Sequence, residues 1–209
     1  MADTVTPMED PYADYDEIDE TAEVPPALGF VAEDGRGSLP FTLIHGEALV
    51  AAATWSLGES GVTPVDFTTS WEGMVAAEEP LVLHDSLCPM TPPAFIAHCV
   101  STALAREAVV VGVRPVTDTV KKLTIEDGVP VLGATIDRTS LVSVASPIVL
   151  PPAVVAALDD WPSGDFAEIA GSLARRFPVV SVEAPPVGRR VASEDDVRLL
   201  EALSASAVR

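Results

Sequence analysis

Two apolar segments of the chain each end in polar side chains whose chemistry suits ligand binding. LVLHD at 81–85 ends in an aspartate, and AVVVGVRP at 108–115 leads into TDTVKK at 117–122. Such segments are typical of buried parallel strands, and ligands of open α/β sheets bind outside the carboxyl ends of those strands. We therefore expect one cleft that contains Asp85 together with hydroxyl, acidic and basic side chains.

A glycine-bearing turn, Gly35-Arg36-Gly37, follows the first predicted strand, and Arg36 is the only lysine or arginine between residues 1 and 105. Two interpretations of Arg36 stand equally, as a phosphate contact or as a turn residue, because so short a glycine pattern is weak evidence. Cys88, Cys99 and the three histidines show no metal-ligand spacing. We therefore expect neither a zinc site nor a disulfide.

The elements that must position these side chains alternate between strands and helices, which predicts an α/β fold. We expect the first helix to end at Gly58, and Thr91 and Ser193 to cap the helices that follow them. Strands are predicted at 27–32, 81–84, 108–113 and 179–183, and helices at 47–57, 71–77, 92–106, 152–158, 165–176 and after Ser193.

Residues 120–135 alternate around the turn Glu126-Asp127-Gly128, which predicts a β-hairpin that projects from the sheet. A two-stranded arm is marginally stable alone. It therefore needs a partner surface, and a second subunit is the natural supplier.

The composition, with 48% hydrophobic and 21% charged residues among 209, is that of one folded domain. A net charge of −20 opposes nucleic acid and anionic membranes. Residues 1–23 hold nine acids and no base, so residues 1–25 are expected to form a disordered acidic tail or a partner-binding acidic arm. The chain has no run of eighteen uncharged apolar residues and no basic signal segment, so we predict no membrane span and a cytoplasmic location.

Four motifs, in order, resemble the 2-C-methyl-D-erythritol 4-phosphate cytidylyltransferases. LVLHDSLCP is similar to that family's HDAxRP motif, VRPVTDTVKK to PVxDTxK, ATIDRTSLVSVASP to xRxxLxxxxTPQ, and RRVASEDDVRLLEAL to KVTxPEDLxLAE. The resemblance implies a Rossmann-like, mostly parallel sheet flanked by helices over residues 26–209, with the arm at about 119–138 and a homodimer formed through it. It also implies CTP, methylerythritol phosphate and Mg²⁺ as partners of an active enzyme.

The resemblance also implies roles for individual residues. Asp85, Arg138 and Arg190 match catalytic positions: Asp85 lies beside the substrate phosphate and the metal, Arg138 is lent to a neighbouring subunit, and Arg190 replaces a lysine. Substrate contacts are implied for Thr119, Ser146 and Lys121, and nucleotide contacts for Gly35, Arg36 and Gly37.

The nucleotide half departs from the family pattern. Glu33 and Asp34 enter the glycine loop, Phe41 stands in place of a lysine and Cys88 in place of an arginine, and the cytosine region is compressed into residues 60–80. Our leading hypothesis is a degenerate member that binds a phosphate metabolite or regulates, with little or no catalysis and no cofactor. One alternative is an active, Mg²⁺-dependent cytidylyltransferase whose missing cations come from Arg36, Lys121 and Lys122, and another is an acidic-tailed interaction module without a ligand.

Overall fold

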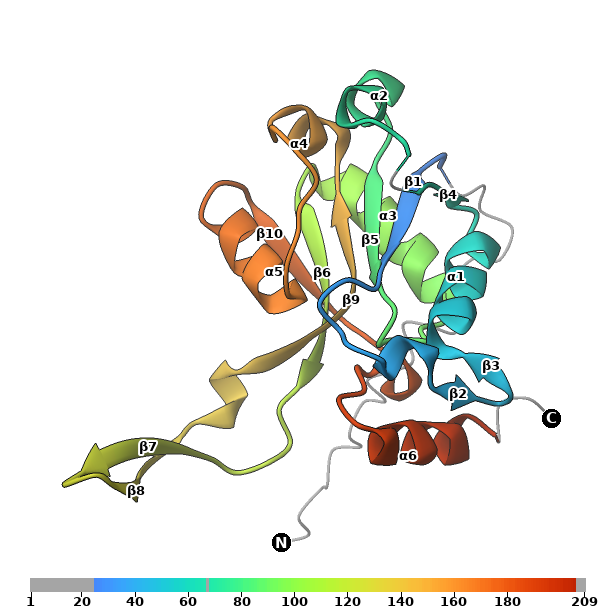
Figure 1. Cartoon of the computed structure of the whole chain (residues 1–209). Helices are drawn as coiled ribbons and strands as arrows, with labels where there is room; N and C mark the ends of the chain where they lie inside the picture. The colour runs from blue at the N-terminus through green and yellow to red at the C-terminus, as the bar shows by residue number, and fades with distance from the viewer. Residues whose placement is uncertain (1–24, 67, 206–209) are drawn as a thin grey trace, which may run out of the picture.

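The computed structural model describes residues 25–66 and 68–205, so the predicted acidic tail lies almost entirely outside the described residues. A six-stranded sheet in the order β10-β6-β9-β5-β1-β4 forms its centre (Figure 1). All neighbouring strands pair in parallel except β9, which runs antiparallel to β5 and β6. The strands are β1 (Leu28–Ala32), β4 (Thr63–Pro64), β5 (Leu81–Asp85), β6 (Val109–Pro115), β9 (Val142–Leu150) and β10 (Val179–Glu183).

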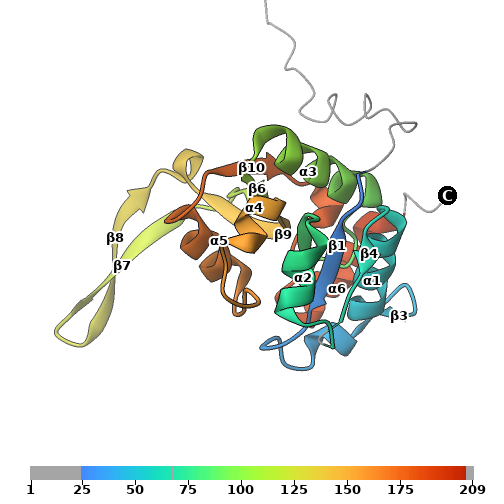
Figure 2. The same ribbon diagram turned by 90° about the horizontal axis from the view of Figure 1, so that it is seen from above.

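Helices cover both faces of the sheet (Figures 1 and 2). One core cluster joins one face to α1 and α3, a second joins the other face to α2, α4 and α5, and a third packs α6 beneath the strand ends. The predicted α/β class is confirmed. The helices are α1 (Leu49–Glu59), α2 (Trp71–Ala77), α3 (Pro93–Arg106), α4 (Pro152–Ala156), α5 (Phe166–Ala174) and α6 (Glu194–Ser204), and the short strands β2 (Leu43–Ile44) and β3 (Glu47–Ala48) lie beside α6.

Strand β5 is buried along its whole length, as its unbroken apolar sequence predicts for a central strand. Successive side chains of a strand point to opposite faces, so Val82 joins the α1–α3 core while Leu81 and Leu83 join the α2–α5 core. Asp85 ends the strand at its carboxyl edge. The apolar run thus fixes the position of the carboxylate.

Several predicted helix boundaries are wrong. Thr91 does not cap α3, because its hydroxyl donates to the Cys88 carbonyl and the N-cap position belongs to Pro92. The first helix begins two residues later than predicted, since Glu47–Ala48 pairs with β2 as a strand, and it runs through Gly58 to Glu59. Ser193 does cap α6, accepting a hydrogen bond from the Asp196 N–H.

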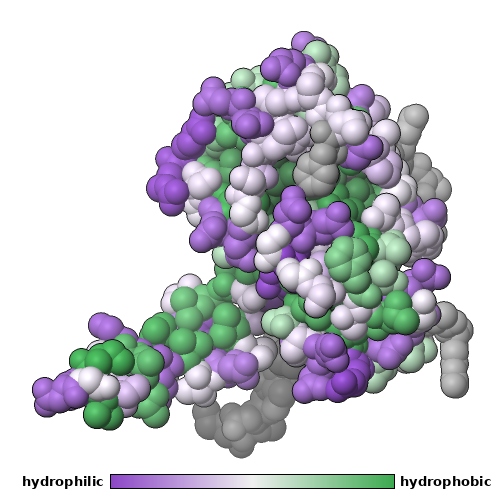
Figure 3. Space-filling model, viewed as in Figure 1, coloured by the Kyte–Doolittle hydropathy of each residue, from purple (hydrophilic) through white to green (hydrophobic). Residues whose placement is uncertain are grey.

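The predicted hairpin is confirmed as β7 (Val120–Glu126) and β8 (Val129–Ile136), which project from the body (Figure 1). Its turn residues Asp127 and Gly128 have φ of 48° and 77°, the left-handed pair that a tight two-residue hairpin turn requires. Apolar side chains gather on the arm surface (Figure 3).

In the described residues, no helix has the length and apolar character to cross a membrane.

Candidate functional site

Asp85 lies at the centre of an ion network beyond the carboxyl end of β5. Its carboxylate is fully buried, and the Arg36 Nε donates to Oδ1 at 2.5 Å while the Arg190 Nε donates to Oδ2 at 2.9 Å. The Leu87 N–H also donates to Oδ1 at 3.0 Å. Both oxygens of this acid are therefore committed to protein donors.

Arg36 reaches Asp85 because the glycine turn directs its side chain inward. Gly35 and Gly37 have φ of 75° and 61°, in the left-handed region that residues other than glycine rarely adopt. The Arg36 side chain is 5% exposed, and its guanidinium donates through Nη1 to the Asp34 carbonyl and lies with Cζ 5.4 Å from the Phe166 ring centroid. Neither predicted role describes this geometry fully, because the turn residue is also half of a buried ion pair.

Arg190 links the same carboxylate to the start of α5. Its Nη2 lies 3.5 Å from Asp165 Oδ2, and Asp165 itself caps α5 by accepting a hydrogen bond from the Ala167 N–H. Partial burial alone lowers the pKa of Arg190, but the hydrogen bond and the charge of Asp85 outweigh it and raise that pKa. Arg190 is therefore a fixed cation that holds β5 against α5.

A Mg²⁺ ion does not fit this arrangement of residues. An ion at Asp85 would have to displace a guanidinium, and burial without compensation is costly for the arginine left behind.

Ser146 is buried behind Asp85 and is already bonded. Its Oγ lies 2.5 Å from His84 Nδ1 and accepts a hydrogen bond from the Asp85 N–H at 3.0 Å. Burial lowers the pKa of His84 to about 4, so the imidazole is neutral at pH 7. Burial likewise raises the pKa of the Cys88 thiol well above its usual range. These three side chains pack and orient the strand ends.

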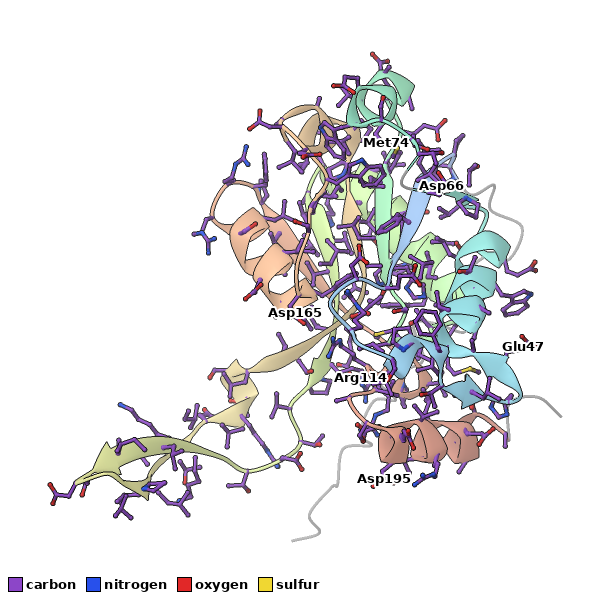
Figure 4. The ribbon with its side chains drawn as sticks, viewed as in Figure 1. Glu47, Asp66, Met74, Arg114, Asp165 and Asp195 are labelled. Atoms are coloured by element: carbon purple, nitrogen blue, oxygen red, sulfur yellow. The ribbon has the colours of Figure 1, made fainter. Side chains whose placement is uncertain are left out.

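A cavity of about 410 Å³ opens beside this network where the arm leaves the body, and we name it the arm-root cavity. Arg114 at the end of β6 and Asp165 at the start of α5 lie on this same edge of the sheet (Figure 4). The walls of the cavity combine cationic, anionic and hydroxyl groups. These groups belong to Arg114, Thr117, Asp118, Ser143, Arg189 and Arg190.

The structure brings together only some of the residues that the resemblance assigns. Asp85, Arg36 and Arg190 converge, and Ser146 adjoins them through the Asp85 backbone. Elsewhere, Arg138 is exposed and its Nη1 donates to the Thr117 carbonyl, while Thr119 and Lys121 are exposed near the root of the arm.

Sequence reasoning missed three residues of the cavity wall, namely Arg114, Ser143 and Arg189. A signal for two of them was present. Arg114 and Arg189 directly precede the motif residues Pro115 and Arg190 in the sequence. A residue next to a motif residue is expected to lie near the same site.

Comparison with curated proteins gives two relatives, although no protein-family model matches the chain. A protein of Anaeromyxobacter sp. (strain Fw109-5) described as bifunctional enzyme IspD/IspF is 31% identical over 121 residues, covering 56% of this chain and 31% of that protein. The 2-C-methyl-D-erythritol 4-phosphate cytidylyltransferase of Nocardia farcinica (strain IFM 10152) is 32% identical over 135 residues, covering 63% of this chain and 56% of that protein. The chain thus spans about a third and about half of the lengths of these relatives.

Solved structures supply the match in fold. The 4-diphosphocytidyl-2C-methyl-D-erythritol synthase of Anaerococcus prevotii DSM 20548 superposes with a TM-score of 0.58 at 13% identity, over 85% of this chain and 97% of that one. The 2-C-methyl-D-erythritol 4-phosphate cytidylyltransferase of Thermus thermophilus gives 0.57 at 19% identity, over 85% and 98%. This chain is thus similar to the 2-C-methyl-D-erythritol 4-phosphate cytidylyltransferases, in sequence over part of its length and in fold over most of it.

Proposed function

We propose that the chain binds a small phosphorylated metabolite in the arm-root cavity, and that it has little or no cytidylyl-transfer activity. The observation that carries this proposal is the Arg36–Asp85–Arg190 network. Transfer from a nucleoside triphosphate depends on cations that position and neutralise the phosphates. Here Arg36, the one lysine or arginine of residues 1–105, is paired with Asp85, and each oxygen of Asp85 already accepts a hydrogen bond from a guanidinium.

Charge around the glycine turn also disfavours a triphosphate. Glu33 and Asp34 stand in the turn, and the position of the family lysine is held by Phe41. Acids beside a phosphate-binding backbone repel the ligand. Gly35, Arg36 and Gly37 therefore remain candidates for nucleotide contact only if Arg36 leaves Asp85.

The arm-root cavity supports a polyol phosphate as the ligand. Arginine guanidinium groups suit a phosphate, while the Ser143 hydroxyl and the Asp118 carboxylate can accept hydrogen bonds from sugar-alcohol hydroxyls. Methylerythritol phosphate, which is named in the description of the N. farcinica relative, is the first ligand to test. Thr119 and Lys121 remain proposed substrate contacts, and the cytoplasmic location stays a prediction.

Two measurements on the wild-type protein test this function. Pyrophosphate release from CTP, Mg²⁺ and methylerythritol phosphate is expected to stay near the protein-free rate, with the N. farcinica enzyme as the positive control. Methylerythritol phosphate alone is expected to raise the melting temperature, since a ligand at one hundred times its Kd stabilises by about 2.7 kcal/mol.

Each opposite result selects another function. Robust pyrophosphate release contradicts the proposal and favours an active cytidylyltransferase, for which the exposed Lys121 and Lys122 offer extra cations. Absence of any shift with CTP or with sugar phosphates favours an interaction module without a ligand.

We also propose that two copies of the chain associate through the arm, as a two-stranded hairpin needs a partner surface. Leu132 is 74% exposed and Ile125 66% exposed, and neighbouring apolar side chains extend this surface (Figure 3). Apolar surface of this kind marks an interaction site. Arg138, at the foot of the arm, is the proposed contribution to the neighbouring subunit.

The paired substitution Ile125→Glu and Leu132→Glu is expected to convert a dimer into a monomer, because it places charges within the proposed contact. Light scattering coupled to size-exclusion chromatography measures the mass directly. Trp55→Glu, at a 62% exposed apolar residue on α1, is the matched control and should leave the mass unchanged. A wild-type protein that is monomeric at all concentrations refutes the arm-mediated dimer.

A further inference from the structure

The three arginines of the arm-root cavity differ in how far their charges are already compensated. Arg114 donates through Nη1 to the Ala184 carbonyl at 2.6 Å, and the same nitrogen lies 3.4 Å from Glu183 Oε1. Arg190 is bound to Asp85 and Asp165. A ligand anion must compete with a carboxylate for either guanidinium.

Arg189 is the exception. It is partly buried in the cavity wall, directly after the short helix Pro186–Gly188, and in the described part of the chain it has no hydrogen bond or ion pair. Its five N–H donors are therefore available without the loss of any protein contact. The planar guanidinium presents two parallel N–H groups at the spacing of two phosphate oxygens.

The acceptor groups of the cavity wall constrain how a ligand lies. Asp118 and Ser143 supply acceptor oxygens, and the Asp118 carboxylate repels an anionic group placed beside it. A ligand with one anionic end and several hydroxyls therefore turns its anion toward Arg189 and its hydroxyls toward Asp118 and Ser143.

We propose that Arg189, and not the motif residue Arg190, supplies the anion-binding guanidinium of the arm-root cavity and recognises a phosphomonoester on a small polyol. This inference rests on the proposed metabolite-binding function and names the residue that reads the phosphate. Arg190 then acts as a positioning residue, since its bonds to Asp85 and Asp165 hold β5 and α5 around the cavity.

Calorimetric titration with two probes tests the assignment, using methylerythritol phosphate and its dephosphorylated polyol. Arg189→Gln is expected to weaken binding of the phosphate probe by about 10- to 100-fold, the loss of one charge-assisted contact. Arg189→Lys should restore part of the affinity, because lysine keeps the charge without the bidentate geometry. Binding of the polyol alone should not change in either variant.

Arg106→Gln is the matched control, as it removes the same charge from the exposed end of α3. Equal weakening by Arg106→Gln and Arg189→Gln reveals a long-range charge effect and overturns the assignment. Undiminished binding of the phosphate probe by Arg189→Gln also overturns it, while the metabolite-binding function survives. Failure of the wild-type protein to bind the phosphate probe overturns both.

Discussion

Asp85→Ala is expected to lower the free energy of unfolding by about 3–5 kcal/mol, because it leaves two arginines facing each other without their shared carboxylate. The Arg36 side chain is 5% exposed, so water has little access to replace the missing partner, and Arg190 keeps only its 3.5 Å contact with Asp165. The Leu87 N–H loses its acceptor as well. Urea denaturation at pH 7 measures the change.

Two further variants identify the cause. Asp118→Ala removes an exposed carboxylate at the same end of the molecule and should shift the free energy of unfolding by less than about 0.5 kcal/mol. Arg36→Met, added to Asp85→Ala, removes the buried uncompensated charge and should recover part of the stability. Equal effects of Asp85→Ala and Asp118→Ala would show that the ion network contributes nothing.

Phe166→Ala is expected to cost about 3–5 kcal/mol of folding stability, the range for deleting a buried aromatic side chain. Phe166 is 1% exposed at the start of α5, and its ring lies beneath the Arg36 guanidinium with a centroid distance of 5.4 Å. The substitution thus opens a cavity in the second core and removes one support of the glycine turn. Thermal and urea unfolding report both effects.

Phe41→Ala is the comparison for this variant, since Phe41 is 62% exposed and its loss should be nearly neutral. A double-mutant cycle between Phe166→Ala and Arg36→Met isolates the contact between ring and guanidinium, expected to be about 0.5–2 kcal/mol. Additive effects within error would mean that Arg36 and Phe166 are energetically independent.

Local patterns were sufficient to predict much of the fold. The unbroken apolar run of β5 placed Asp85 at the strand end, and the Asp127-Gly128 turn predicted the arm, because both signals arise from neighbouring residues. The predicted helix cap at Thr91 was wrong. The Thr91 hydroxyl bonds to the Cys88 carbonyl, and such competition between nearby acceptors is invisible to a capping rule.

The site depended on contacts that no local pattern specifies. Arg36 and Asp85 are 49 positions apart, and Arg190 and Asp85 are 105 apart. The family motifs identified all three residues. They did not predict that Arg36 would bind one oxygen of Asp85 and Arg190 the other. Arg189 received no ligand contact, because an arginine beside a motif is also typical of ordinary surface charge until the cavity is visible.

The shared carboxylate has a consequence for protein engineering. Single substitutions will not create a nucleotide site, because releasing Asp85 to bind a metal leaves a buried guanidinium without its carboxylate partner. A productive redesign must exchange Arg36 for a neutral residue in the same step that introduces a lysine at Phe41. Gain of nucleotide binding in this chain therefore requires simultaneous replacements at Arg36 and Phe41, because neither replacement alone is favourable.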